Sequence, residues 1–497
     1  MVHACVLVAL VGLTGAEVPK TEEPAVIEIG KRRQLFVDRL LVEKLTRTRL
    51  VLNRPKDEGP VLRFDKPWEG LFAGVCTVIK DGDTYRLYYR GLPKAGGDGS
   101  NLEVTCYAES RDGIKWVKPD VGLFEVAGTR KNNVVLAGQP PFSHNFSPFL
   151  DTRPGVAESE RYKALAGKKH GRVGKGVKAD GLAAFVSADG IHWKPKQRAV
   201  LTKGAFDSQN VAFWSAGEQK YICYFRTWTG SRPGSGFRTV SRATSDDFIT
   251  WADPQPMRFS SGRPEHIYTN QTHPYFRAPH IYVALAARFM PGRQVVSDAE
   301  ARRLGVDPKY YRDCSDGVLM TSRGGDLYDR TFMESFVRPG IGLQNWVSRA
   351  NHPALNVVQT SPTEMSIYVS QDYAQPTAHL RRYSLRLDGF ASVHAPYAGG
   401  ELLTKPLVFK GSRLLLNFAT SAAGGIRVEI QDAKGRPIPG HSLRHARELI
   451  GNEIDREVSW RGVGDVSGLA GKTIRLRFVM KDADLYAMQF SGPARPE

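Results

Sequence analysis

The stretch Ser110-Arg-Asp-Gly-Ile-Lys-Trp116 returns further along the chain with the same spacing between its serine and its aromatic residue. Near copies are Ser187-Ala-Asp-Gly-Ile-His-Trp193 and Ser245-Asp-Asp-Phe-Ile-Thr-Trp251, and a weaker copy is Ser322-Arg-Gly-Gly-Asp-Leu-Tyr328. A phrase that recurs at long intervals indicates a repeat architecture. Because Asp binds its own backbone and Gly adopts positive φ without a steric penalty, the phrase predicts a turn between two strands.

Alternating apolar segments surround each copy of this turn. One strand runs into the turn, a second precedes it by one loop, and a third apolar stretch lies before that. The second strands are easiest to recognise: Tyr85–Arg90, Tyr162–Ala166, Tyr221–Arg226, Ile281–Ala286 and Ile367–Ser370. Four strands repeated about five times are the composition of a β-propeller blade, so residues from about 35 to 395 predict a five-bladed propeller.

The two ends of the chain differ from this pattern. After Phe390 the sequence gives short strands separated by turns, which predicts a C-terminal β-sandwich. At the N-terminus, the apolar run Ala4–Leu13 and the small residues up to Ala16 predict a secretory signal, although a short buried strand is the alternative. We therefore expect an all-β, secreted or periplasmic protein with a signal at 1–16, a propeller at 17–397 and a sandwich at 398–497. No other apolar run is long enough to span a membrane.

Charge is the most distinctive feature of the composition. Lys and Arg total 69 against 51 Asp and Glu, which gives a net charge of +18. Basic residues gather in predicted loops at one end of the propeller, above all 167–178 and 290–316, and Ser297 and Glu300 in the latter form a capping box that predicts a short helix. A solvated basic surface is the alternative reading, but this placement favours an anionic ligand such as a sulfated or uronate-containing glycan. Nucleic acid is not indicated, since no stacking platform or groove-binding helix is recognisable.

Candidate catalytic residues lie where the inner strands of the blades begin. Asp207 opens an inner strand and is followed by polar residues, so we expect it to be the general acid, with Glu69 as its partner and His144 tuning a neighbouring acid. Each also has a structural alternative: a turn cap, a surface acid and a hydrogen-bonded loop histidine. Hydrogen bonding and stacking to sugar are expected from a larger set: Asn145, Gln209, Asn210, Arg277, His280, Trp346 and Arg349.

No cofactor and no metal are expected. No C-x-x-C pair occurs, and His273 and His280 do not have the spacing of metal ligands. Of the remaining cysteines, Cys76 and Cys106 fall in one blade, where they either pair or stay as buried thiols. Nothing in the sequence indicates the oligomeric state.

The recurring phrase Y-x-L-Y-Y followed by S-x-D-G-x-x-W resembles the five-bladed propeller glycosidases of glycoside hydrolase families 32 and 43, and the layout is similar to secreted bacterial propeller proteins. A sandwich after the propeller also resembles family 32. The resemblance implies acids on the inner strands of the first three blades, which gives Glu69 in the first and Asp207 in the third. In the second blade His144 and Asn145 stand where an Asp is expected, and the first blade lacks the Asn-Asp-Pro pattern of family 32, so a divergent family is indicated.

The function predicted is therefore hydrolysis of a glycosidic bond in a poly- or oligosaccharide by carboxyl groups in the propeller funnel. A non-catalytic glycan-binding propeller is the alternative, favoured by the missing acid in the second blade. A lyase or sulfatase-like enzyme is a third possibility, for which His144, His280 and Tyr311 would be the acid and base groups.

Overall fold

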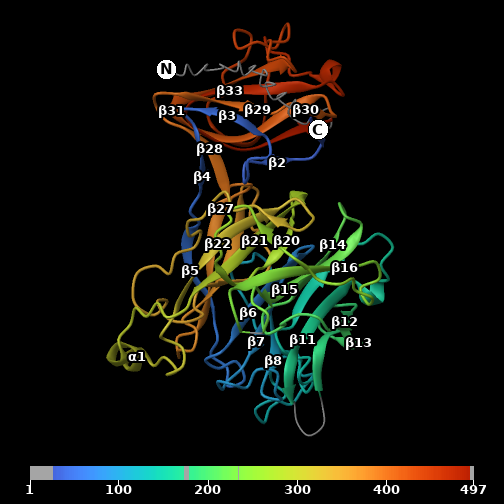
Figure 1. Cartoon of the computed structure of the whole chain (residues 1–497), viewed down its shortest axis with the longest axis vertical. Helices are drawn as coiled ribbons and strands as arrows, with labels where there is room; N and C mark the ends of the chain where they lie inside the picture. Colours follow the sequence, from blue (N-terminus) through green and yellow to red (C-terminus); the bar gives the residue numbers. More distant parts are fainter. Residues whose placement is uncertain (1–25, 173–177, 233, 493–497) are drawn as a thin grey trace, which may run out of the picture.

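A computed structural model describes residues 26–172, 178–232 and 234–492, and the predicted signal segment lies outside this range. The regular secondary structure of the described chain is almost entirely β, arranged as a propeller below and a separate sheet module above (Figure 1). Among the described residues, helical structure is limited to α1 (Asp298–Leu304) and the short turns η1 (Glu158–Glu160) and η2 (Ser467–Leu469). Within the described ranges, no helix combines the length and apolar character needed to cross a membrane.

Five blades form the propeller, as the repeats predict. The first three blades each contain four consecutive antiparallel strands. They are β6 (Gly74–Asp81), β7 (Thr84–Gly91), β8 (Val104–Ser110) and β9 (Val134–Leu136); β10 (Ser147–Leu150), β11 (Tyr162–Arg172), β12 (Lys178–Ser187) and β13 (Lys194–Leu201); and β14 (Val211–Ser215), β15 (Lys220–Trp228), β16 (Arg238–Ser245) and β17 (Gln255–Pro256).

The last two blades are less regular. Blade four has a divided inner strand, and its small outer pair, β18 with β23, is parallel. Its strands are β18 (Arg258–Phe259), β19 (His266–Thr269), β20 (Thr272–Tyr275), β21 (Ala278–Met290), β22 (Cys314–Ser322) and β23 (Leu327–Tyr328). Blade five contains β24 (His352–Pro353), β25 (Val358–Gln359), β26 (Glu364–Gln371), β27 (His379–Arg386) and, from the N-terminal part of the chain, β5 (Lys56–Arg63). Because β5 pairs antiparallel with β27, an early segment closes the ring.

The repeated turn has the geometry that its sequence predicts. In the first copy, Ser110 Oγ accepts the backbone N–H of Gly113 at 2.9 Å and Asp112 Oδ1 accepts that of Lys115 at 2.8 Å. The turn also joins neighbouring blades, since the hydroxyl of Tyr368 in blade five donates to the carbonyl of Gly113 and that of Tyr88 in blade one donates to the carbonyl of Gly190. The phrase therefore stabilises both the hairpin and the contact between blades.

The remaining strands form one ten-stranded sheet around a single apolar core. They are β1 (Ile27–Gly30), β2 (Gln34–Leu35), β3 (Val42–Thr46), β4 (Arg49–Leu52), β28 (Ala391–Ala395), β29 (Gly400–Thr404), β30 (Leu407–Phe409), β31 (Arg413–Asp432), β32 (Asn452–Glu457) and β33 (Ile474–Ser491). Residues 27–52 therefore belong to this sheet module. The predicted boundaries had placed them in the propeller. These four short strands carry no signal of their partners, which lie more than 300 residues away in the sequence.

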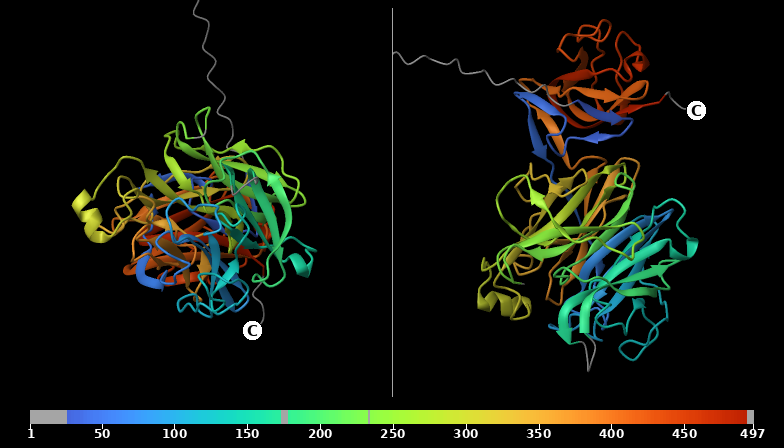
Figure 2. Two further views of the ribbon diagram at one scale, coloured as in Figure 1. Left: turned by 90° about the horizontal axis from the view of Figure 1, so that it is seen from below. Right: turned by 45° about the vertical axis from the view of Figure 1, so that its right-hand side comes forward.

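The sheet module and the propeller contact one another through a buried ionic junction. Asp388, at the end of the propeller, accepts hydrogen bonds from Arg33, Tyr275 and Asn417 at 2.9–3.1 Å and also contacts Arg277 at 3.1 Å. The opposite end of the propeller, at the bottom of Figure 1, carries helix α1 and the ends of β11 and β12 that lie away from the sheet module, and the right-hand view of Figure 2 shows the same arrangement.

The structure confirms the predicted helix after Ser297 and decides between the two alternatives for the cysteines. Helix α1 begins after Ser297, whose side chain accepts the N–H of Glu300 in a capping box. The cysteines Cys76, Cys106, Cys223 and Cys314 are all buried free thiols, so Cys76 and Cys106 do not pair.

Candidate functional site

A polar cavity of about 200 Å³ lies where the five blades meet. Every blade contributes to its wall, through strands as well as loops. The lining residues are Gly74, Val75, Arg90, Asp98, Asn145, Lys168, Asp207, Ser208, Gln209, Tyr268, Thr269, Tyr310, Arg349, His352, Ser370 and Tyr373. An adjoining hollow of about 460 Å³ shares Lys168 and Asp207 with the cavity and adds Arg226, Trp228 and Arg232.

Asp207 is the predicted residue that faces this cavity most openly. It precedes β14, and its side chain is 56 % exposed although the surrounding walls exclude most bulk water. Arg226 Nη2 lies 3.1 Å from one carboxylate oxygen and His144 Nε2 lies 3.5 Å from the other. Burial alone would raise the pKa of Asp207, but His144 and Arg226 outweigh it and hold the pKa well below its usual value. An ionised carboxylate cannot donate a proton, so this environment favours a role as base or nucleophile over the predicted role of general acid.

His144 lies behind Asp207 and joins it to a second carboxylate. The imidazole is 1 % exposed, and its Nδ1 lies 2.9 Å from Glu103, which is itself fully buried and also accepts the backbone N–H groups of Gly99 and Asn145. Burial lowers the pKa of His144, but the Glu103 and Asp207 carboxylates outweigh it and raise the pKa to about 9. The three side chains therefore form a carboxylate–imidazolium–carboxylate row that ends in the cavity.

Asp98 is the second carboxyl group in the cavity wall, and it contacts Arg90 at 3.2 Å. Ligand atoms of Asp98, Glu103 and His144 lie within 4.8 Å of one another, which is close enough for a metal site. A histidine ligand must be neutral with a free ring nitrogen, whereas both nitrogens of His144 already face carboxylates. The cluster is better described as an ion-pair network.

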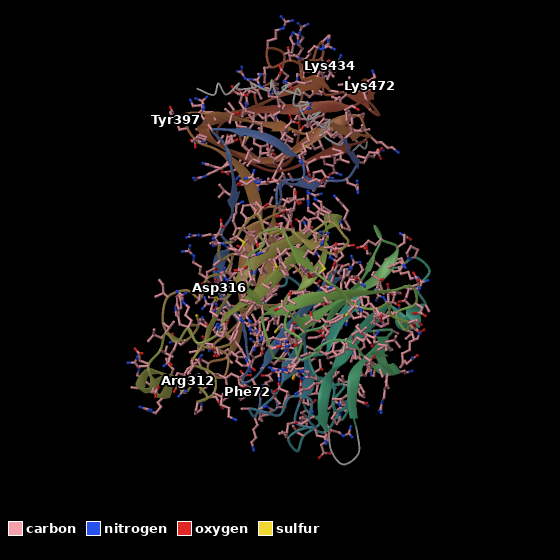
Figure 3. The ribbon with its side chains drawn as sticks, in the orientation of Figure 1. Phe72, Arg312, Asp316, Tyr397, Lys434 and Lys472 are labelled. Atoms are coloured by element: carbon pink, nitrogen blue, oxygen red, sulfur yellow. The ribbon has the colours of Figure 1, made fainter. Side chains whose placement is uncertain are left out.

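Aromatic side chains form the rest of the wall. Tyr268 stacks on His352 at 5.2 Å between ring centroids, and Tyr310 and Tyr373 pack edge-on against each other at 5.7 Å. Phe72, which Figure 3 labels near the lower end of the propeller, supports both of these tyrosines from behind. The Tyr373 hydroxyl accepts a hydrogen bond from Arg90 at 3.0 Å, and burial raises its pKa to about 12, so it stays protonated at neutral pH.

Three other predicted residues lie at or near the cavity. Asn145 and Arg349 line it directly. Gln209 also lines it, but its amide donates to Cys76 and Thr77 and accepts from Gln271, so its bonding capacity is largely used between blades. Asn210 does not reach it, because its amide is buried and donates to the carbonyls of Phe206 and Ser208.

The structure does not bring Glu69 to the cavity, so it cannot act as the catalytic partner expected from sequence. Its side chain is 0 % exposed and accepts hydrogen bonds from Tyr89 at 2.5 Å, Lys118 at 2.8 Å and the backbone N–H of Lys66 at 2.9 Å. Glu69 thus satisfies buried donors at the edge of blade one.

Arg277, His280 and Trp346 are also wrongly predicted as cavity residues. Arg277 and His280 lie at the opposite end of blade four, where Arg277 contacts Asp388 and His280 lies 3.2 Å from the Gln34 amide. Trp346 instead lines a separate groove beside blade four, together with Phe237, Phe289 and Met290. β20 and β21 are joined by a two-residue turn, which carries Arg277 to the end of blade four that lies away from the cavity.

Several residues that define the site are not among those predicted from the sequence, above all Arg90, Arg226 and Tyr268. A signal was present for the two arginines. Tyr85–Arg90 and Tyr221–Arg226 both read Tyr-x-x-Tyr-aromatic-Arg, so an arginine ends the same strand in blades one and three. Tyr268 lies in β19, the half of the divided inner strand that was not predicted.

Comparison with known proteins identifies fold relatives only. No protein-family model matches the chain, and no curated protein matches it. Among solved structures, it is similar to an N-acetylgalactosamine deacetylase from F. plautii in complex with blood group B trisaccharide (14 % identity, TM-score 0.45, covering 69 % of this chain and 96 % of that one). It is also similar to a family 43 arabinoxylan arabinofuranohydrolase from Bacillus subtilis (11 %, 0.37, 85 % and 96 %) and an exo-inulinase from Aspergillus awamori (12 %, 0.37, 86 % and 99 %).

Propeller glycoside hydrolases are thus among the structures that this chain resembles, as the repeated phrase predicts. At these identities and TM-scores the likeness concerns the fold, and the function has to be argued from the site.

Proposed function

We propose that the protein is a carbohydrate-active enzyme that hydrolyses O-glycosyl bonds of a saccharide bound in the cavity between the five blades. The observation that carries this proposal is the ionised Asp207 carboxylate, which faces the cavity while Arg226 and His144 hold it from behind. A fixed carboxylate stabilises the positive charge that develops on the sugar ring, and it can also activate water or attack the anomeric carbon.

A proton donor for the leaving oxygen is the second requirement. Asp98 takes the place that we expected for Glu69 as the second carboxyl group, but it is already paired with Arg90 at 3.2 Å. Tyr373 keeps its proton at neutral pH, and because its oxygen accepts from Arg90, its O–H remains to be donated into the cavity. We assign Asp207 as base or nucleophile, Tyr373 as proton donor and His144 as the residue that positions Asp207.

The proposal extends to an anionic, uronate-containing or sulfated saccharide, which is supported by the excess of basic side chains at the cavity. It also extends to an exported enzyme, for which the apolar segment 4–13 is the support, and to a β-sandwich arrangement of the sheet module, whose strands enclose one apolar core.

One observation favours a second candidate, a non-catalytic glycan-binding propeller. Both carboxyl groups that line the cavity are paired with arginines, Asp98 with Arg90 and Asp207 with Arg226. Such pairs suit binding as well as they suit catalysis.

The test is release of reducing ends from neutral, uronate-containing and sulfated polysaccharides by the wild-type protein and the variants Asp207→Asn and Tyr373→Phe. We expect each variant to lower the rate by about 10²- to 10⁴-fold, the usual contribution of acid–base groups. Asp246→Asn serves as a matched control, because Asp246 is 80 % exposed and lies at a surface turn of blade three. Full activity in Asp207→Asn would overturn the assignment, and glycan binding without release of reducing ends would favour the second candidate. Products carrying a new carbon–carbon double bond would show a lyase instead.

A further inference from the structure

We propose that Arg349, with Arg238 beside it on the ring of Tyr268, forms a binding site for one anionic substituent of the sugar, a carboxylate or a sulfate ester. The inference rests on the proposed function only in placing a saccharide in this cavity. It adds the chemical group that is recognised and the residues that recognise it.

Three guanidinium groups surround one tyrosine. Those of Arg226, Arg349 and Arg238 lie 5.0, 5.5 and 5.5 Å from the centroid of the Tyr268 ring. Arg349 also lies 4.7 Å from the ring of Tyr310. A guanidinium held between two aromatic faces has a fixed plane, which prepares its N–H donors for two-point binding of an oxyanion.

Arg238 is also held against aromatic rings. Its guanidinium lies 4.6 Å from the ring of Trp228 and 4.9 Å from that of Phe289. Burial and the nearby charges of Arg226 and Arg349 lower the pKa of Arg238, which reports that the three cations repel one another. Such repulsion destabilises the empty site and is relieved when an anion binds.

The charges at the site do not balance. Six cationic groups (Arg90, Lys168, Arg226, Arg238, Arg349 and the His144 imidazolium) face three carboxylates (Asp98, Glu103 and Asp207), each of which already contacts one of them. Among the side chains that the structure describes, no carboxylate lies within 4.0 Å of Arg238 or Arg349. The Nε–H of Arg238 is buried without an acceptor, and so is that of Arg226. Buried donors of charged groups are costly to leave unpaired, so these N–H groups add to the cost of the unbalanced charge.

His352, which stacks on Tyr268, is affected by the same positive charges. Burial and then the charges of Arg349, Arg90 and Arg226 lower its pKa to about 3, so the imidazole is neutral at physiological pH. The residue is 8 % exposed and lines the cavity, and its Nε2 has no hydrogen-bond partner in the described chain. A neutral imidazole beside a cluster of arginines is suited to bind a sugar hydroxyl next to the anionic group.

The size of the cavity limits the ligand to a single charged sugar unit at this point. About 200 Å³ accommodates one sugar ring and excludes a bulky polyanion such as duplex nucleic acid. A carboxylate and a sulfate ester share the required chemistry, namely a compact oxyanion with several acceptor oxygens, and the experiment separates them.

The experiment measures binding, and therefore does not depend on catalysis. Isothermal titration calorimetry at constant ionic strength compares galactose, galacturonate and galactose 6-sulfate, and the matching glucose series, with the full-length protein. The sugars of each series differ only at C6. We expect at least one anionic sugar to bind at least tenfold more tightly than the neutral one, and Arg349→Gln to remove most of this preference. Arg238→Gln should weaken anion binding less, since it acts mainly through its charge, and Arg349→Lys should recover only part of it because the planar fork is lost.

Arg444→Gln is the matched control, because it removes the same charge from an exposed position on the sheet module. Equal binding of neutral and anionic sugars, no detectable binding of any anionic sugar at millimolar concentration, or unchanged anion binding in Arg349→Gln would each overturn the inference. Preference for the uronate alone or for the sulfate alone identifies the substituent. If the protein binds anionic sugars but hydrolyses no glycan, the proposed hydrolase function is wrong and the anion site stands. If it hydrolyses neutral glycans only, the hydrolase function stands and the anion site is wrong.

Discussion

The imidazole Nε2 of His144 lies 3.5 Å from Oδ1 of Asp207, while its Nδ1 lies 2.9 Å from Glu103. A fully buried histidine therefore joins a carboxylate in the protein interior to one in the cavity. The charged imidazole and Arg226 favour the ionised form of the cavity carboxylate, so the charge of Asp207 is set in part by a histidine that does not itself line the cavity.

This arrangement predicts a pH-dependent stability. The pKa of His144 is about 9 in the folded protein and about 6.5 in an unfolded chain. Its contribution is fully present below the unfolded value and is lost as the pH rises through the folded value. We expect the difference in free energy of unfolding between wild type and His144→Gln to fall by on the order of 3 kcal/mol between pH 6 and pH 10. His192→Gln, at an exposed turn, should behave as wild type in the same urea titrations; a difference that stays constant with pH would refute the charged imidazole.

A second prediction concerns Glu69, whose role we now expect to be structural and not catalytic. Glu69→Gln should lower the free energy of unfolding by about 3 kcal/mol, because the mostly buried Lys118 then keeps only one carboxylate partner, the exposed Asp65. The rate of hydrolysis at a temperature where the variant is folded should not change. Asp65→Asn removes the exposed partner of the same lysine and should cost less than about 1 kcal/mol. Loss of activity in folded Glu69→Gln would contradict the structural role and support a catalytic one.

The junction between the propeller and the sheet module gives a third prediction. Asp388 is 0 % exposed and contacts both Arg33 and Arg277, so Asp388→Asn should lower the free energy of unfolding by about 3–5 kcal/mol. Asp455 contacts the same two arginines but is 43 % exposed, so Asp455→Asn should cost less than about 1 kcal/mol. Chemical denaturation of both variants tests this difference. Similar losses in the free energy of unfolding would contradict the prediction that burial makes Asp388 the more important of the two carboxylates.

The repeated turn gives a fourth prediction. Gly190 has φ +75°, and an added Cβ would lie 2.5 Å from the Tyr88 hydroxyl of the neighbouring blade. Gly128 has the same φ with nothing within 4 Å, so Gly128→Ala reports the backbone strain alone, about 1–2 kcal/mol. Gly190→Ala should cost at least about 1 kcal/mol more, since the hydrogen bond between blades is also lost. Thermal unfolding of the two variants measures the difference, and equal losses would show that the turn does not link the blades.

Much of the propeller could be predicted because its signals are local. The turn phrase fixes hairpin geometry through bonds within five residues, and the period-two strands around it fix the blade. The capping box at Ser297 predicted α1 for the same reason. The site was predicted only in part: Asp207, His144, Asn145 and Arg349 were found from their positions at inner-strand starts, whereas Glu69, Arg277, His280 and Trp346 were placed by the same rule and lie elsewhere.

The sequence by itself thus determined the repeat, the turn and the all-β class, since these depend on residues a few positions apart. Only the tertiary structure decided which strand closes the ring, that residues 27–52 join the C-terminal sheet, and that Asp207 is ionised. Each of these depends on partners far away along the chain: β5 pairs with β27 across more than 300 residues, and Asp207 takes its charge state from His144 and Arg226 on other loops and strands. A local pattern carries no information about such partners, because pairing and electrostatic interaction depend on distance in space.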